Sequence, residues 1–186
     1  IWNDNMGVEG LTIMPTNVAI DGNGDLIVTD VMGSWLLRLA PDGSTGEAIA
    51  SFSGLTGGYD SGGRILSPEG VAIDESGMLY IADSSSNAIL RVDPVSGKTY
   101  RLATNSSTNG DLNIPVDITI DERGFLYYVN GLSNEIFKMH PDTGKTKFIA
   151  SGNTTEGIID SLVSIAINSN DTIFTTNVSS DSGNSG

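Results

Sequence analysis

Short runs of apolar residues alternate with clusters of turn-forming residues along the whole chain. The runs are rich in Val, Ile, Leu and Tyr, and the clusters between them contain Gly, Asp, Asn, Ser and Pro, which is typical of strands joined by tight turns. In the extended segment 70–74, Val71 and Ile73 point to one side and Ala72 points to the other. No part of the sequence keeps a helical period. The pattern predicts an all-β protein.

The same pattern occurs four times, and the copies begin near Pro15, Pro68, Pro115 and Leu162. In each copy a second run follows that ends in Asp or Asn, and in the first three a third run with a basic residue leads into a turn and a fourth run. The strands expected in the second copy are residues 70–74, 78–83, 88–93 and 98–103. Four antiparallel strands in a repeat of this length form one blade of a β-propeller, and neighbouring blades must stack to bury their faces.

The motif of residues 68–84, Pro-Glu-Gly-Val-Ala-Ile-Asp followed by Gly-Met-Leu-Tyr-Ile-Ala-Asp-Ser, resembles the NHL-repeat propellers. It is similar as well to the related gluconolactonase/SMP-30-like and streptogramin-lyase-like propellers. The resemblance extends over residues 15–177 and implies a six-bladed ring. It indicates the fold more than the function, because this superfamily contains both scaffolds and enzymes.

We predict that residues 1–178 form propeller repeats that are incomplete at both ends and that residues 179–186 form a flexible polar tail. The fourth copy has only its first two strands. Open sheet edges and apolar faces would remain, so we expect further blades of the same chain, or partner copies, to complete the ring. A self-closed ring of four blades is the alternative.

Nine basic and 23 acidic residues give a net charge of −14, which repels nucleic acid and anionic lipid. No apolar run is long enough to insert into a membrane. The absence of Cys excludes disulfides, thiolate nucleophiles and zinc–thiolate sites. This composition favours an extracellular or periplasmic location.

The resemblance implies a calcium ion at the channel mouth, held by residues at the start of the innermost strands. The positions that match are Thr16, Glu69, Val116 and Val163. Glu69 is the single carboxylate among them and therefore a weak metal candidate, whereas calcium needs several converging oxygens. Asn17 and Asp117 lie one residue further on, where strand alternation would turn their side chains elsewhere. Both are candidate ligand contacts, and no other cofactor is expected.

Two recurrent polar motifs are interpreted as structural. The run 21–25 begins like a calcium-binding loop, but Leu26 and Met32 stand where an EF-hand needs Gly and Glu, so we predict a hairpin turn. One Asp or Asn ends the second strand of each copy, and we expect these residues to cap local turns: Asp30, Asp83, Asn130 and Asn177. The recurrent basic residues are placed to pair with them: Arg38, Arg91 and Lys138.

The remaining candidates are His140 and a loop insertion. His140 is the sole imidazole and is expected at an outer turn, as a surface residue and not as a general base. The segment 53–64 is a Gly-rich insertion between the first two copies, on the side of the channel entrance. Tyr59, Asp60 and Arg64 are its candidate contacts to a ligand, and a tolerated surface insertion is the alternative.

Taken together, the residues favour an NHL-like binding scaffold that displays loops around a central channel to a protein or small-molecule ligand, with no catalytic residue. The alternative is a metal-dependent lactonase or a streptogramin-lyase-like enzyme whose catalytic residues lie largely outside this sequence. A repeat block of a large surface protein is a third reading of the same pattern.

Overall fold

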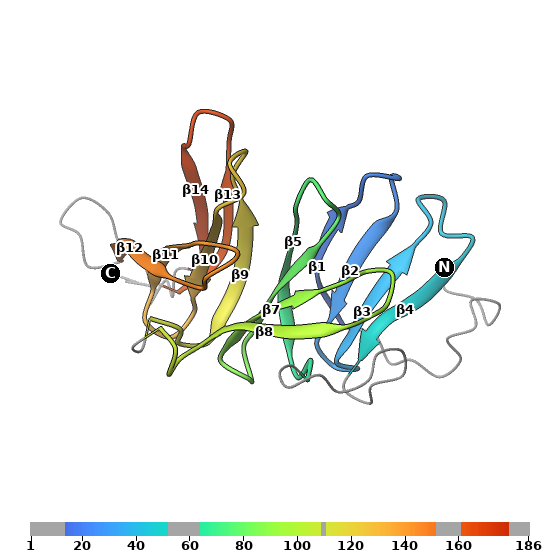
Figure 1. Cartoon of the computed structure of the whole chain (residues 1–186), viewed down its shortest axis with the longest axis horizontal. Coiled ribbons are helices and arrows are strands. Elements are labelled where there is room, and N and C mark those ends of the chain that lie inside the picture. The colour runs from blue at the N-terminus through green and yellow to red at the C-terminus, as the bar shows by residue number, and fades with distance from the viewer. Residues whose placement is uncertain (1–13, 52–63, 109–110, 152–160, 179–186) are drawn as a thin grey trace, which may run out of the picture.

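In the computed structural model, residues 14–51, 64–108, 111–151 and 161–178 are described, and every regular element in these ranges is a β-strand. The strands form separate antiparallel sheets that stand side by side like the blades of a fan (Figure 1). In these parts of the chain there is no helix with the length and apolar character needed to cross a membrane. The prediction of an all-β propeller architecture is confirmed.

Each sheet pairs its strands in sequence order. The first blade contains β1 (Pro15–Ile20), β2 (Leu26–Asp30), β3 (Trp35–Leu39) and β4 (Gly46–Ser51). The second contains β5 (Pro68–Ile73), β6 (Leu79–Asp83), β7 (Ala88–Val92) and β8 (Thr99–Thr104). The third contains β9 (Pro115–Ile120), β10 (Leu126–Asn130), β11 (Glu135–Met139) and β12 (Thr146–Ser151). The fourth sheet contains β13 (Leu162–Ile167) and β14 (Ile173–Asn177).

Each observed strand of the second blade begins and ends within two residues of its predicted bounds. The predicted four-stranded blades are therefore present in the first three repeats, and the fourth shows the two strands expected of it. The polar segment 179–186 and residues 1–13 lie outside the described residues. The domain boundaries and the size of the complete ring stay predictions.

Blades pack face to face, and alternation along each strand decides which neighbour a side chain contacts. We call the face toward the preceding blade the leading face and the face toward the following blade the trailing face. On β5, Val71 belongs to the leading face and packs with Ile27 and Leu36 of the first blade. The next residue, Ala72, belongs to the trailing face and packs with Ile118 of the third blade. The predicted division of this strand between two sides is confirmed.

Among the described residues, apolar side chains on the two outer faces of the fan are exposed to solvent. Val18 on the leading face of the first blade is 56 % exposed, whereas its counterpart Val71 is 5 % exposed. Phe174 on the trailing face of the fourth sheet is 55 % exposed, whereas its counterpart Tyr127 is 5 % exposed. The repeat thus places apolar residues on faces that a neighbouring blade covers elsewhere in the chain.

This difference in burial predicts a difference in stability. Val71→Ala removes two buried methyl groups from the interface of two blades and is expected to lower the free energy of unfolding by about 2 kcal/mol. Val18→Ala is the matched control at the same repeat position and is expected to change it by less than about 0.5 kcal/mol. Urea unfolding followed by Tyr and Trp fluorescence measures both values. Equal losses would show that the leading face of the first blade is covered in solution.

Candidate functional site

The hairpin between the first two strands of each blade is closed by an Asp or Asn side chain. Oδ1 of Asp21 accepts hydrogen bonds from the backbone N–H of Asn23 at 2.8 Å and of Asp25 at 3.0 Å. Gly24 adopts a φ of 88°, in the left-handed region that glycine tolerates. The same side-chain contacts recur in the other blades at Asp74, Asp121 and Asn168. The run 21–25 is therefore a hairpin turn, as predicted.

The Asp or Asn that ends the second strand holds the segment before the innermost strand, and in the first two blades it also caps the following turn. Asp30 accepts from Gly33 N at 2.7 Å through one oxygen and from Met14 N at 2.9 Å through the other. Asp83 makes equivalent contacts. Asn130 instead accepts from Asn113 N and donates to the Asp111 carbonyl, both in the segment before the innermost strand. The predicted capping of the following turn is therefore confirmed for Asp30 and Asp83. All three side chains are fully buried and are held by the chain itself, so they need no ligand.

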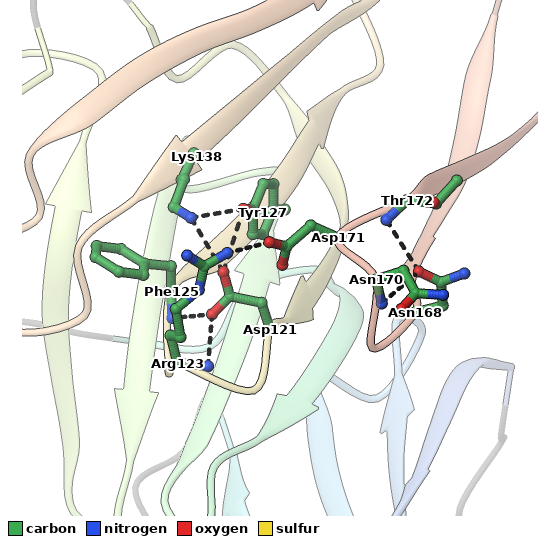
Figure 2. A network of polar contacts seen from close by, with 9 residues as sticks. All are labelled: Asp121, Arg123, Phe125, Tyr127, Lys138, Asn168, Asn170, Asp171 and Thr172. Atoms are coloured by element: carbon green, nitrogen blue, oxygen red, sulfur yellow. Dashed lines mark hydrogen bonds and ion pairs between the residues drawn. The ribbon is translucent and has the colours of Figure 1, made fainter.

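Two of the recurrent basic residues, Arg38 and Lys138, pair with the hairpin acids, and for these two the prediction that they pair with the strand-ending Asp and Asn was wrong. Lys138 Nζ donates to Asp121 Oδ2 at 3.0 Å and to the Tyr127 hydroxyl at 2.6 Å (Figure 2). Arg38 Nε lies 3.7 Å from Asp21 Oδ2. The reason is the strand register, which places Lys138 opposite Tyr127 in the middle of the sheet and away from the end of β10.

The Asp121 carboxyl is nearly inaccessible to solvent in this network. Desolvation pushes its pKa up, but hydrogen bonds from Lys138 and from the Phe125 backbone outweigh this effect, and the pKa lies below its ordinary value near 3.8. Figure 2 shows the Arg123–Asp171 ion pair joining the third and fourth hairpins beside it.

The candidate ligand contacts lie on the innermost strands, where every blade has a β-bulge. The pairing of β1 with β2 shifts between Pro15 and Asn17, and the equivalent shifts occur in the other three sheets. A bulge sets two residues against one and breaks the alternation of side chains. Strand alternation is therefore interrupted just before Asn17 and Asp117, and the direction of their side chains is given by their hydrogen bonds.

The structure brings Asn17 and Asp117 together although they are 100 residues apart. Asn17 Nδ2 donates to Asp117 Oδ1 at 2.9 Å, and Ile118 N donates to the same oxygen at 2.9 Å. The other oxygen accepts from Ser164 Oγ at 2.7 Å and from Ile165 N at 2.8 Å. Burial raises the pKa of Asp117, and these four donors oppose that shift. One carboxylate thus ties together innermost strands of the first, third and fourth blades.

Gly70 of the second blade fills the gap between these partners. A Cβ atom at this position would lie 2.5 Å from Asp117 Oδ1 and 2.6 Å from Asp117 Cα. Glycine therefore allows β5 to approach β9 and leaves room for the Asn17 side chain to reach Asp117. Residues 17, 70, 117 and 164 occupy the same repeat position, so an alignment of the four repeats reveals this set. Reading each motif alone missed Gly70 and Ser164.

Glu69 lies apart from this brace. Its Oε1 accepts from Ser84 Oγ at 3.1 Å, and burial, with a smaller effect of the Asp83 charge, raises its pKa. In the described ranges, no three His, Asp or Glu side chains come close enough to hold a metal ion. Both oxygens of Asp117 are occupied by protein donors. The described residues therefore do not fit the calcium site that the family resemblance implies.

The other candidates are placed as follows. Arg64 is exposed just before β5, whereas Tyr59 and Asp60 lie outside the described residues. His140 follows β11 at the outer turn, where its Nδ1 accepts from Asp142 N at 3.2 Å and its ring meets the edge of Phe125 at 5.5 Å. It belongs to the turn, as predicted, but it is half-buried and not the surface residue that was expected, because its ring packs against Phe125.

Comparisons with known proteins support the fold. No family model matches the chain. The chain is 28 % identical over 104 residues to Protein SUPPRESSOR OF QUENCHING 1, chloroplastic, of Arabidopsis thaliana; the match covers 55 % of this chain and 10 % of that protein.

Three solved structures are similar over most of this chain, which spans little more than half the length of each of them. A gluconolactonase from Xanthomonas campestris has 14 % identity and a TM-score of 0.69, and the match covers 89 % of this chain and 55 % of that one. A virginiamycin B lyase from Staphylococcus aureus, solved with quinupristin, has 17 % identity, a TM-score of 0.60 and coverages of 90 % and 57 %. Nidogen in its complex with laminin has 19 % identity, a TM-score of 0.62 and coverages of 84 % and 52 %. The chain thus has the fold of the superfamily that its motifs resemble.

The brace around Asp117 predicts a strong effect of a single methyl group. Gly70→Ala is expected to lower the free energy of unfolding by about 1–3 kcal/mol, because the new Cβ atom must displace Asp117 or its backbone. Gly22→Ala is the control, since nothing lies within 4 Å of its Cβ position, and a change within about 0.5 kcal/mol is expected. Urea unfolding measures both. A neutral Gly70→Ala would contradict the close approach of β5 and β9.

The lowered pKa of Asp121 predicts a pH dependence. A carboxyl with a folded-state pKa below its unfolded value contributes stability above the unfolded value, and that contribution is lost as the pH falls through the folded-state pKa. Asp121→Asn should therefore be less stable than the wild type at pH 7, and the difference should shrink below about pH 4. Thermal unfolding from pH 7 to pH 2.5 tests this. Glu122→Gln, at the exposed neighbouring residue, should follow the wild-type curve.

Proposed function

We propose that the chain is part of an NHL-like β-propeller binding scaffold, which recognises a protein or small-molecule ligand at the channel entrance and performs no chemistry there. The observation that carries this proposal is the fully occupied carboxylate of Asp117. All four of its hydrogen-bond donors come from the chain itself. A group committed in this way braces the blades and has no lone pair left for a metal ion or a substrate proton.

The proposed ligand surface consists of the loops on the channel-entrance side, above this brace. Tyr59, Asp60 and Arg64 on the insertion are the proposed contacts, and the brace that Asn17 and Asp117 form is proposed to hold the strands that carry the loops. The rigid sheets would hold these loops at fixed spacing, which lowers the entropy lost on binding. Among proteins of this fold, nidogen is found with laminin and the lyase with quinupristin, so both partner classes are compatible with the architecture. An extracellular or periplasmic location belongs to the same proposal.

A calcium-dependent lactonase is the alternative to a scaffold, and the following experiment distinguishes the two. The melting temperature is measured with 5 mM calcium chloride and with a chelator, and hydrolysis of gluconolactone is followed in the same buffers. For a scaffold, the two melting temperatures should agree within about 1 °C, and the lactone should hydrolyse at its uncatalysed rate.

A bound ion at a concentration 100 times its Kd would stabilise the folded state by about 2.7 kcal/mol. A rise in melting temperature of several degrees that disappears in Glu69→Gln, together with calcium-dependent lactone hydrolysis, would overturn the scaffold proposal. Ser76→Ala is the control, because Ser76 lies in the second hairpin at the opposite end of the strands.

A further inference from the structure

A groove of about 550 Å³ lies between the first and second blades, at the end of the sheets that carries the hairpins. It is bounded by the β1–β2 hairpin, the β5–β6 hairpin and the turn at Pro94 and Val95. Figure 1 shows the two hairpins next to each other at the top of the molecule. The loops of the proposed channel-entrance surface are at the other end of the strands. The groove is therefore a separate feature from the surface discussed above.

The groove exists because one repeat lacks an aromatic side chain that the others have. The strand register places Ile27 opposite Arg38, Tyr80 opposite Arg91 and Tyr127 opposite Lys138. In the second and third blades, the Tyr hydroxyl reaches the hairpin acid, at 3.1 Å for Asp74 and 3.2 Å for Asp121. Ile27 has neither the ring nor the hydroxyl, so space remains above it that the phenol ring fills elsewhere.

The sides of the groove are apolar. Ile20 and Val95 line it with 68 % and 92 % of their surfaces exposed, and Ile27 and Leu79 lie fully buried beneath it. Arg38 also lines the groove, and its guanidinium is held by Asp21 and Glu47. The surface that a ligand can contact in the groove is therefore largely Ile20 and Val95.

The rim is acidic. Asp74 uses one oxygen for the turn at Ser76 and the other for Tyr80, whereas Glu75 is exposed at the edge of the groove. The whole chain carries a net charge of −14, which attracts basic partners over a long range and raises their rate of association. The apolar sides and the acidic rim together fit a side chain with an aliphatic stem and a cationic head.

We propose that this groove binds an extended, basic segment of a partner protein. A Lys or Arg of that segment lays its aliphatic stem between Ile20 and Val95 and places its cation beside Glu75. This proposal does not depend on the scaffold proposal, because it concerns the opposite end of the blades.

The test uses a fluorescein-labelled peptide, acetyl-Leu-Lys-Leu-Lys-Leu-amide, and its Glu-for-Lys counterpart as probes in an anisotropy titration of the whole chain. The Lys peptide should bind with a salt-dependent affinity, and the Glu peptide should bind at least about tenfold more weakly. Glu75→Lys should weaken binding of the Lys peptide about fivefold or more. Glu122→Lys makes the same charge change at the same hairpin position of the third blade, and it should leave binding within about twofold.

A second variant tests the shape of the groove. Ile27→Tyr introduces the residue that the second and third blades carry, so it should keep the fold, fill the groove and abolish binding. Backbone amide resonances of the wild type should shift around Asn23, Ser76 and Val95 when the peptide is added.

Three results would overturn the proposal: no binding by the wild type, equal weakening by Glu75→Lys and Glu122→Lys, or unchanged binding by a folded Ile27→Tyr. If Ile27→Tyr does not fold, the matched Glu variants decide alone. None of these outcomes affects the calcium and lactone test, so the two proposals fail independently.

Discussion

The structure depends on the close approach of the innermost strands, which leaves no space for ordinary side chains between some of them. Gly70 brings β5 against β9, and Asp117 uses the remaining space to collect donors from three blades. Burying a carboxylate is expensive unless each lone pair is matched by a donor. The four matched bonds offset that cost and couple the blades. Neighbouring blades supply most contacts in a repeat architecture, and Asp117 adds a contact from the first blade to the third.

Most of the fold was predictable because its determinants are local. Strand alternation at Val71 and Ala72, the hairpin turn at Asp21 and the cap at Asp30 each depend on residues that are close in sequence, and the four repeats supply independent copies of the same signal. The site was predicted less well. A β-bulge leaves no compositional mark at Asn17 or Asp117, and their hydrogen bond joins residues 100 positions apart. The predicted ion-pair partner of Lys138 was wrong for a related reason. The actual partner is set by the cross-strand register, which the sequence pattern does not reveal.

Differences between repeats are informative because the repeats share a backbone. An Asp that three blades share at the same turn indicates a role in stabilising that turn. Where one blade has Ile27 and two have Tyr, the space that opens is specific to one junction between blades. The same comparison separates Gly70 from the polar residues that occupy its position elsewhere. Each repeat therefore serves as an internal reference for the others, and it supplies substitutions that the architecture already tolerates.

The exposed faces around Val18 and Phe174 are of opposite kinds. Val18 lies on a leading face, which elsewhere packs against the preceding blade, and Phe174 lies on a trailing face, which elsewhere packs against the following blade. Two molecules meeting through these surfaces would join head to tail, without a twofold axis between them. Whether such an assembly ends as a ring or continues as a filament would depend on whether the rotation per molecule divides a full turn. The geometry of a single sheet junction, repeated, would then set the number of subunits in the assembly.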